Sequence, residues 1–334
     1  MRSANGRECV VIYEKRMEIS VNEKAKKRMN LNRVLVLVIG SLLGVSFVGS
    51  TGVMAASAPP LPTVAIIDVG VNASLFTNIV TEVCIVEMLA CPNGKQFMEG
   101  KGAADTGVSK NKSIDHGTNM VSIVTKVNPK VGIIPIRIVS TTTNGSLGLY
   151  SNKAVKSALD WVLSNQAKFN IVAVSVSQGK VFKNCSVPDG TAKVIDDLRA
   201  KEVAVIAAAG NDRNQNEMMS IACLPNAISI GATDNPDPGV GGIAFCRTCE
   251  PTIARYSNGN PTYYLNGRWY VTQGDGSTKF TVGTSNATSA FAAWWTLNFK
   301  GTIQSTFEWM NSVASIAKNP ERVGKYISLP ETGK

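Results

Sequence analysis

The sequence predicts an α/β protein of three layers, with a mostly parallel central sheet flanked by helices. Five short runs are almost continuously apolar and rich in valine and isoleucine, which indicates strands covered on both faces. These runs span residues 63–68, 131–139, 169–177, 202–210 and 226–232. Helical patterns at residues 117–127, 151–166 and 190–201 separate them, and this alternation favours an open sheet between helices.

The ends of these strands carry polar or glycine-containing turns. The first strand ends at Asp68, the third runs into residues 175–179, and the fourth runs into residues 208–211. Helical segments also open at His116, within "DHGT", and at Ser285, within "GTS". In open α/β sheets, ligands bind at the carboxyl ends of the strands. The sequence therefore predicts a functional site at this edge of the sheet.

The N-terminal region has the order of a secretory signal. A segment rich in basic residues, 24–33, precedes an apolar run at 34–48. Small residues follow the run, and Val53-Met-Ala55 is the favoured cleavage site. The apolar run is shorter than the roughly 20 residues that span a bilayer. We therefore expect a secreted or periplasmic protein, with an uncleaved signal-anchor as the alternative.

The net charge of +10 does not indicate nucleic-acid binding. Nine of the lysines and arginines, against four acidic residues, lie within the first 33 residues, and the remaining surplus forms no clustered run. Binding to nucleic acid needs a basic patch and not merely a high net charge. A hydrophobic content of 44% with 17% charged residues is typical of a globular protein.

Cysteine usage fits an oxidising compartment. Six cysteines lie beyond the leader, an even number, and they allow 15 pairings among which the sequence does not choose. Cys246 and Cys249 could instead form a redox or metal half-site, although no second pair completes a zinc site. No acidic segment resembles a calcium loop, so we assign no cofactor and no metal site, and structural calcium stays unassigned.

Four residues are candidates for a catalytic site. His116 is the only histidine, and its ordinary pKa lies near neutrality. Taken singly, Asp68 and Asn211 have an alternative as turn residues, and Ser285 has one as a helix N-cap. Their conjunction, in the order Asp68, His116, Asn211, Ser285 and with matching neighbours, favours catalysis.

The segments around these residues resemble those of subtilisin-like serine peptidases, the subtilases. The matching blocks are "AIIDVG" at Asp68, "HGTNMVSIV" at His116, "AAAGND" at Asn211 and "GTSNATSAFAA" at Ser285. Subtilisin also carries its catalytic residues in the order Asp, His, Ser. The resemblance spans about residues 62–313. It implies a subtilisin-like fold and a serine endopeptidase that hydrolyses polypeptides through an acyl-enzyme intermediate.

The resemblance implies a role for each residue. Ser285 would be the nucleophile, His116 its general base, and Asp68 the carboxylate that orients the imidazole. Asn211 would donate to the oxyanion. Asp115 is the alternative partner of the imidazole, but adjacent residues do not easily align in this way, so Asp68 is favoured. The implied substrate-binding residues are Ser175, Ser177, Gln178, Gly179, Ala208, Ala209 and Gly210.

The resemblance also implies one disulfide bond, between Cys185 and Cys223. With that pair formed, Cys84 with Cys91 and Cys246 with Cys249 are the remaining local bridges. Two positions depart from the family pattern, since Asn286 and Ser289 stand where subtilases usually have methionine and proline.

The chain is expected to comprise a leader (1–58), a catalytic domain (59–320) and a tail (321–334). The tail ends in "LPETGK", which matches the sortase pentapeptide, but no apolar segment follows it and cell-surface anchoring is disfavoured. We expect a monomer that contacts membranes only during export or through a signal-anchor. The alternative function is an inactive subtilase-like surface or binding module. Dinucleotide binding is disfavoured because no Gly-x-Gly-x-x-Gly turn follows the first strand.

Overall fold

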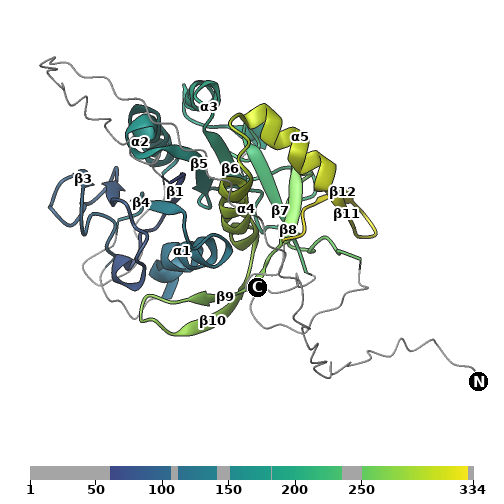
Figure 1. Cartoon of the computed structure of the whole chain (residues 1–334), viewed down its shortest axis with the longest axis horizontal. Coiled ribbons are helices and arrows are strands. Elements are labelled where there is room, and N and C mark those ends of the chain that lie inside the picture. Colours follow the sequence, from purple (N-terminus) through teal and green to yellow (C-terminus); the bar gives the residue numbers. More distant parts are fainter. Residues whose placement is uncertain (1–60, 107–111, 141–150, 182, 235–249, 330–334) are drawn as a thin grey trace, which may run out of the picture. The chain divides into compact units, whose positions relative to one another are not determined.

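The computed structural model describes residues 61–106, 112–140, 151–181, 183–234 and 250–329 (Figure 1). Its contacts divide the chain into two units, Met1–Ala56 and Ser57–Lys334, and all described residues belong to the second. The predicted leader, most of the sortase-like end and the Cys246 and Cys249 pair lie outside the described residues.

Ten of the described strands form one sheet in the order β11-β12-β8-β7-β6-β5-β1-β4-β2-β3. Every pairing in the sheet is parallel except those at its two edges, β2 with β3 and β11 with β12. The strands are β1 (Thr63–Asp68), β2 (Val83–Ile85), β3 (Phe97–Glu99), β4 (Gly132–Arg137), β5 (Ile171–Val176), β6 (Ala204–Ala208), β7 (Ile228–Thr233), β8 (Tyr263–Asn266), β11 (Ser315–Lys318) and β12 (Val323–Tyr326).

Five α-helices of the described chain pack on the two faces of this sheet (Figure 1). They are α1 (His116–Val127), α2 (Asn152–Phe169), α3 (Thr191–Ala200), α4 (Thr284–Asn298) and α5 (Ile303–Val313). Buried residues of α1, α4 and α5 share one hydrophobic core, and those of α2 and α3 share another. The structure therefore has the three layers that the sequence predicts.

Strand β1 explains why the predicted strands read as continuous apolar runs. Val64 and Ile66 pack into the core of α1 and α4, whereas Ala65 and Ile67 pack into the core of α2 and α3. Successive side chains of a strand point to opposite faces, and here both faces are covered by helices. All six residues of β1 are buried.

A separate two-stranded hairpin, β9 (Arg268–Thr272) and β10 (Thr278–Val282), connects β8 to α4. Three 3₁₀ helices complete the described secondary structure: η1 (Ala73–Leu75), η2 (Lys112–Asp115) and η3 (Lys183–Cys185). No helix within the described part of the chain combines the length and apolarity needed to cross a membrane.

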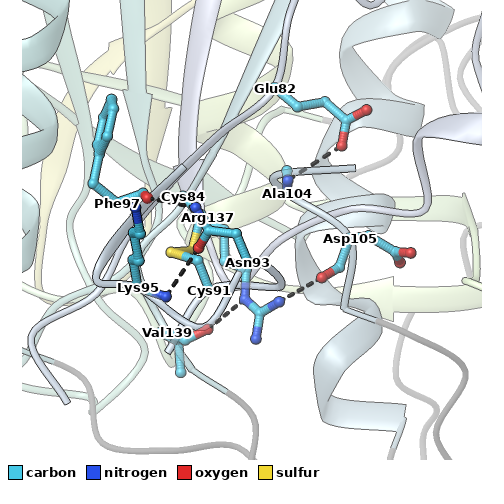
Figure 2. The surroundings of a disulfide bond; sticks show 10 residues. All are labelled: Glu82, Cys84, Cys91, Asn93, Lys95, Phe97, Ala104, Asp105, Arg137 and Val139. Carbon is cyan, nitrogen blue, oxygen red and sulfur yellow. Dashed lines mark hydrogen bonds between the residues drawn. A yellow bond between two sulfur atoms is a disulfide. The ribbon is translucent and has the colours of Figure 1, made fainter. Parts of the chain in front are cut away.

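Two disulfide bonds form in the described structure, Cys84 with Cys91 and Cys185 with Cys223. Both pairs are among those expected above. Figure 2 shows the first bridge beside the buried Arg137, whose Nε donates to the Val139 carbonyl at 2.9 Å and whose Nη1 donates to the Asp105 carbonyl. The bridge closes a loop within the β2–β3 region, and Arg137 joins the segment after β3 to the end of β4, next to β1.

Candidate active site

The carboxyl ends of β1, β5 and β6 and the first residues of α1 and α4 surround one cleft. Its volume is about 820 Å³, and its wall includes His116, Ser177, Gln178, Asn211 and Ser285. Residues that lie far apart in the sequence meet there because parallel strands end at the same edge of a sheet. The structure thus brings the predicted site residues to one place.

Asp68 and His116 are in direct contact. Nδ1 of His116 lies 2.8 Å from Oδ1 and 2.9 Å from Oδ2 of Asp68. The carboxylate is buried at the end of β1, where its Oδ1 also accepts the N–H of Val69 at 2.7 Å. The imidazole side chain remains 32% exposed, so its other face is open to the cleft. The alternative carboxylate, Asp115, precedes α1 and forms no described hydrogen bond with the imidazole.

The residues after His116 explain how α1 approaches β1 so closely. A Cβ atom on Gly117 would lie 2.0 Å from the carbonyl oxygen of Gly70, so no other residue fits at this position. The hydroxyl of Thr118 accepts the N–H of Asn72 at 3.0 Å, which ties the helix to the chain beyond β1. The "HGT" segment is therefore the contact that brings the imidazole to Asp68.

The surroundings of His116 raise its pKa above the ordinary 6.5. Burial acts to lower the pKa, but the negative charge of Asp68 and its hydrogen bond to the ring together raise it by more. The site therefore stabilises the imidazolium, the form that a general base has after it accepts a proton.

Ser285 lies in the first turn of α4, on the wall of the same cleft. It is 7% exposed, and its hydroxyl forms no hydrogen bond with the described residues, His116 included. In unliganded sites a contact of this kind often tightens only when substrate binds. The structure thus joins two members of the predicted triad directly and places the third on the wall of the same cleft.

Asn211 is exposed at the turn that follows β6. Its Oδ1 accepts the backbone N–H of Thr284 at 2.9 Å and the hydroxyl of Thr284 at 3.1 Å. Its Nδ2 makes no hydrogen bond with the described residues. Because Thr284 fixes the carbonyl end of the side chain, the amide end has a defined direction as a donor beside Ser285.

Asn258, in the "YSNGNP" segment, fixes the backbone on both sides of Asn211. This buried side chain accepts the N–H of Asp212 at 2.8 Å and of Asn214 at 3.0 Å, while its own backbone N–H donates to the Gly210 carbonyl at 3.0 Å. Gly210 has a φ of +107°, a conformation that glycine adopts readily. The turn that presents Asn211 is therefore held in one conformation.

The predicted substrate-binding residues divide into two sets. Ser177, Gln178 and Gly179 line the cleft. Ser175 is fully buried within β5, and Ala208, Ala209 and Gly210 are buried and are not part of the cleft wall. Seven further residues of the cleft wall were not predicted as site residues: the polar Asn119, Lys180, Asp212 and Lys279 and the apolar Val69, Val181 and Met219. Asn119, Lys180 and Asp212 lie within three positions of predicted residues in the sequence, a proximity that could have indicated them. Lys279 comes from the β9–β10 hairpin and has no such neighbour.

No group of three or more histidine, cysteine, aspartate or glutamate side chains that could hold a metal occurs among the described residues. Cys246 and Cys249 lie outside the described residues.

The α/β fold, with its cleft at the carboxyl ends of parallel strands, is the fold expected of the subtilase class. The model of the subtilase family matches residues 62–319, most of the chain, and the chain belongs to this family. Among solved structures, a cold-adapted subtilisin-like serine proteinase is 20% identical and superposes with a TM-score of 0.59, over 80% of this chain and 88% of that one. The S41 psychrophilic protease gives the same TM-score at 16% identity, over 77% of this chain and 84% of that one. These likenesses confirm the predicted fold.

Curated relatives are distant. A cuticle-degrading serine protease of Orbilia oligospora is 22% identical over 228 residues, which are 60% of this chain and 51% of that protein. An extracellular serine proteinase of Thermus sp. (strain Rt41A) is 31% identical over 144 residues, which are 41% of this chain and 32% of that protein. The chain thus spans about half the length, or less, of these relatives.

Proposed function

We propose that this chain is a serine endopeptidase that hydrolyses peptide bonds through Asp68, His116 and Ser285. The observation that carries the proposal is the pair of short contacts between Asp68 and His116, at a cleft whose wall also contains Ser285 and Asn211. Membership of the subtilase family supports the same chemistry.

In this mechanism the hydroxyl of Ser285 attacks the substrate carbonyl and its proton passes to Nε2 of His116. Asp68 holds Nδ1 as the protonated nitrogen, which leaves Nε2 free to accept. The oxyanion accepts hydrogen bonds from Nδ2 of Asn211 and the backbone N–H of Ser285. His116 then returns the proton to the leaving amine, and water hydrolyses the acyl-enzyme by the same steps in reverse order.

The substrates are polypeptides that lie in extended form along the segment after β5, where Ser177, Gln178 and Gly179 line the cleft. Nothing in this chemistry needs a cofactor, and we propose none, leaving structural calcium unassigned. We further propose release from the cell, because the name of the Thermus relative describes it as extracellular and because residues 24–60 have the order of a secretory signal. The monomeric state stays a prediction from the sequence.

Covalent labelling by a fluorophosphonate tests the proposal, since this probe reacts only with an activated serine. We expect the wild-type chain to be labelled and Ser285→Ala to remain unlabelled. Ser312→Ala, which changes an exposed serine at the end of α5, is the matched control and should label like the wild type. A folded wild-type chain that takes no label would instead support the inactive binding module.

Replacing Asn211 is expected to lower kcat for a peptide substrate by about 10² to 10³-fold with little change in KM, the range measured for such a donor in subtilisin. Two variants separate donation to the oxyanion from support of Thr284. Asn211→Leu removes both roles, whereas Asn211→Asp keeps an acceptor for Thr284 but places negative charge at the oxyanion.

We expect both variants to lose kcat, with the aspartate variant at least as impaired as the leucine variant. Asn216→Leu, an exposed side chain on the same turn, is the control and should keep the wild-type kcat. Near-normal turnover by Asn211→Asp would contradict the oxyanion role. The measurement is steady-state kinetics on a chromogenic peptide.

A further inference from the structure

Gln178 makes a contact that the proposed triad does not include. Its side-chain Nε2 donates to Oδ1 of Asp68 at 3.1 Å and lies 3.3 Å from Nδ1 of His116. The resemblance to subtilases implies that this residue binds substrate, and it does line the cleft. Its amide, however, is directed at the carboxylate on which the imidazole depends.

We propose that Gln178 is a positioning residue, whose side-chain amide fixes the orientation of the Asp68 carboxylate that holds His116. This inference rests on the proposed function in one respect only, that the same pair takes part in catalysis. The contact itself and its effect on the imidazole can be measured without turnover.

The sheet register places Gln178 at this position. Strand β1 pairs with β5 in parallel, and Ile67 lies opposite Val176. Continuing that register brings the residues after Val176 alongside Asp68 and Val69, because neighbouring strands lie about 4.8 Å apart. Gln178 is half-buried there, with a side chain long enough to reach back over the end of β1.

The two oxygens of Asp68 are used unequally. Oδ1 accepts from the Val69 N–H at 2.7 Å, from Nδ1 of His116 at 2.8 Å and from Gln178 at 3.1 Å. Oδ2 accepts from Nδ1 of His116 at 2.9 Å. A carboxylate can rotate about its Cβ–Cγ bond, and donors from two different strands that meet on one oxygen oppose that rotation. The plane of the carboxylate is therefore set by Val69 and Gln178 together.

The contact also agrees with one tautomer of the imidazole. Ionised Asp68 only accepts hydrogen bonds, so Nδ1 of His116 carries a proton. An amide N–H cannot donate to a nitrogen that is itself a donor, and the N–H of Gln178 is therefore directed at Asp68. This arrangement leaves the lone pair on Nε2, the nitrogen that the mechanism uses as the base.

Removing the amide should change the protonation of His116 in a known direction. A hydrogen bond from Gln178 disperses part of the carboxylate charge, and without it more of that charge acts on the imidazolium. Of the other charged groups near the ring, Asp115 precedes it in the chain, and Lys180, Asp212 and Lys279 line the same cleft. None of these four changes when Gln178 becomes leucine, which has a similar size and no donor.

Nuclear magnetic resonance of the full chain tests this directly, because the only imidazole signals belong to His116. We expect the titration midpoint of the ring to rise by about half a unit in Gln178→Leu. It should rise further in Gln178→Glu, which adds a second carboxylate. Gln304→Leu, the same replacement at an exposed position on α5, is the matched control and should titrate like the wild type.

The turnover number, kcat, provides a second test. At a pH where the imidazole is neutral, Gln178→Leu should lower kcat by roughly 3- to 10-fold, and by the same factor for peptides with different side chains at the cleaved bond. A role only in the pocket wall would change KM in a way that depends on the peptide, and would leave the titration of His116 where it is in the wild type.

An unchanged midpoint in folded Gln178→Leu would overturn the proposal. If that variant does not fold, the wild-type side-chain amide signal of Gln178 takes its place, and it should shift with the same midpoint as the His116 ring. A Gln178 amide signal whose chemical shift does not change as His116 titrates would also overturn the proposal. Because neither measurement needs catalysis, a failed fluorophosphonate reaction would count against the peptidase function and not against the Gln178 contact.

Discussion

The His116→Ala variant is expected to hydrolyse peptides with a kcat about 10⁶-fold below that of the wild type, the loss measured in subtilisin when the histidine is removed. The chain contains no other histidine, so no second imidazole can replace the general base. A residual rate of roughly 10³ to 10⁴-fold above the reaction in water should remain, supplied by the oxyanion donors and substrate binding. The measurement is kcat of the purified full chain.

The control for this variant is its own fold, measured by circular dichroism, because Gly117 next to it sets the contact with Gly70. A loss smaller than about 100-fold in a folded chain would contradict the role of general base.

The raised pKa of His116 gives the wild type a defined pH dependence. Activity needs the neutral ring, so kcat/KM should fall on the acid side with a midpoint above 6.5. Stability should respond in the opposite sense. The folded state favours the imidazolium, and this contribution is fully present below pH 6.5 and is lost as the pH rises through the higher folded value. Both dependences should be absent in His116→Ala.

Replacing Asp68 with asparagine is expected to lower kcat by about 10⁴-fold, as when the triad aspartate of a serine peptidase becomes asparagine. The structure gives a reason for this size. The N–H groups of Val69 and Gln178 both point at the Oδ1 position, so the asparagine should place its oxygen there and its NH₂ at the Oδ2 position. Both positions lie within hydrogen-bonding distance of Nδ1 of His116, and an NH₂ group 2.9 Å away opposes a proton on that nitrogen and favours the tautomer with its proton on Nε2. An imidazole in that tautomer cannot take the proton of Ser285.

Asp115→Asn is the matched control for this variant. Asp115 is also buried and lies next to His116 in the chain, but it forms no described hydrogen bond with the ring. We expect it to keep kcat within about tenfold of the wild type. Steady-state kinetics on the two variants decides between the carboxylates, and an equal loss in both would contradict the assignment to Asp68.

Half of the ten described strands of the central sheet, together with α1, α2, α3 and the start of α4, could be predicted from the sequence, because these elements leave a strong pattern. Strands β1, β4, β5, β6 and β7 are each buried on both faces and coincide with the five apolar runs, except that β7 continues one residue beyond its run, to Thr233. Strand β3 left no such signal, since it has three residues and an exposed edge. Strands β11 and β12 have only four residues each, of which one is buried.

Part of the candidate site could also be predicted from the sequence. Asp68, His116, Asn211 and Ser285 could be found because each lies in a segment with recognisable neighbours. The contact of Gln178 with Asp68 could not be predicted. The direction of this glutamine side chain depends on the register between β1 and β5, and the sequence alone does not reveal that register. Lys279 was missed for a related reason, since the hairpin that carries it to the cleft has no motif of its own.

The contact between Gly70 and Gly117 has a further consequence. Two backbones meet there without any side chain between them, so the depth to which α1 enters the molecule is limited by atoms that cannot change rotamer. Elsewhere in the core, a neighbouring side chain can adjust to a small displacement. This backbone contact fixes how close α1 can come to β1. Substitutions elsewhere in the core should therefore leave the distance between the His116 imidazole and the Asp68 carboxylate unchanged. The cleft could accept new loops or new wall residues while that spacing stays the same.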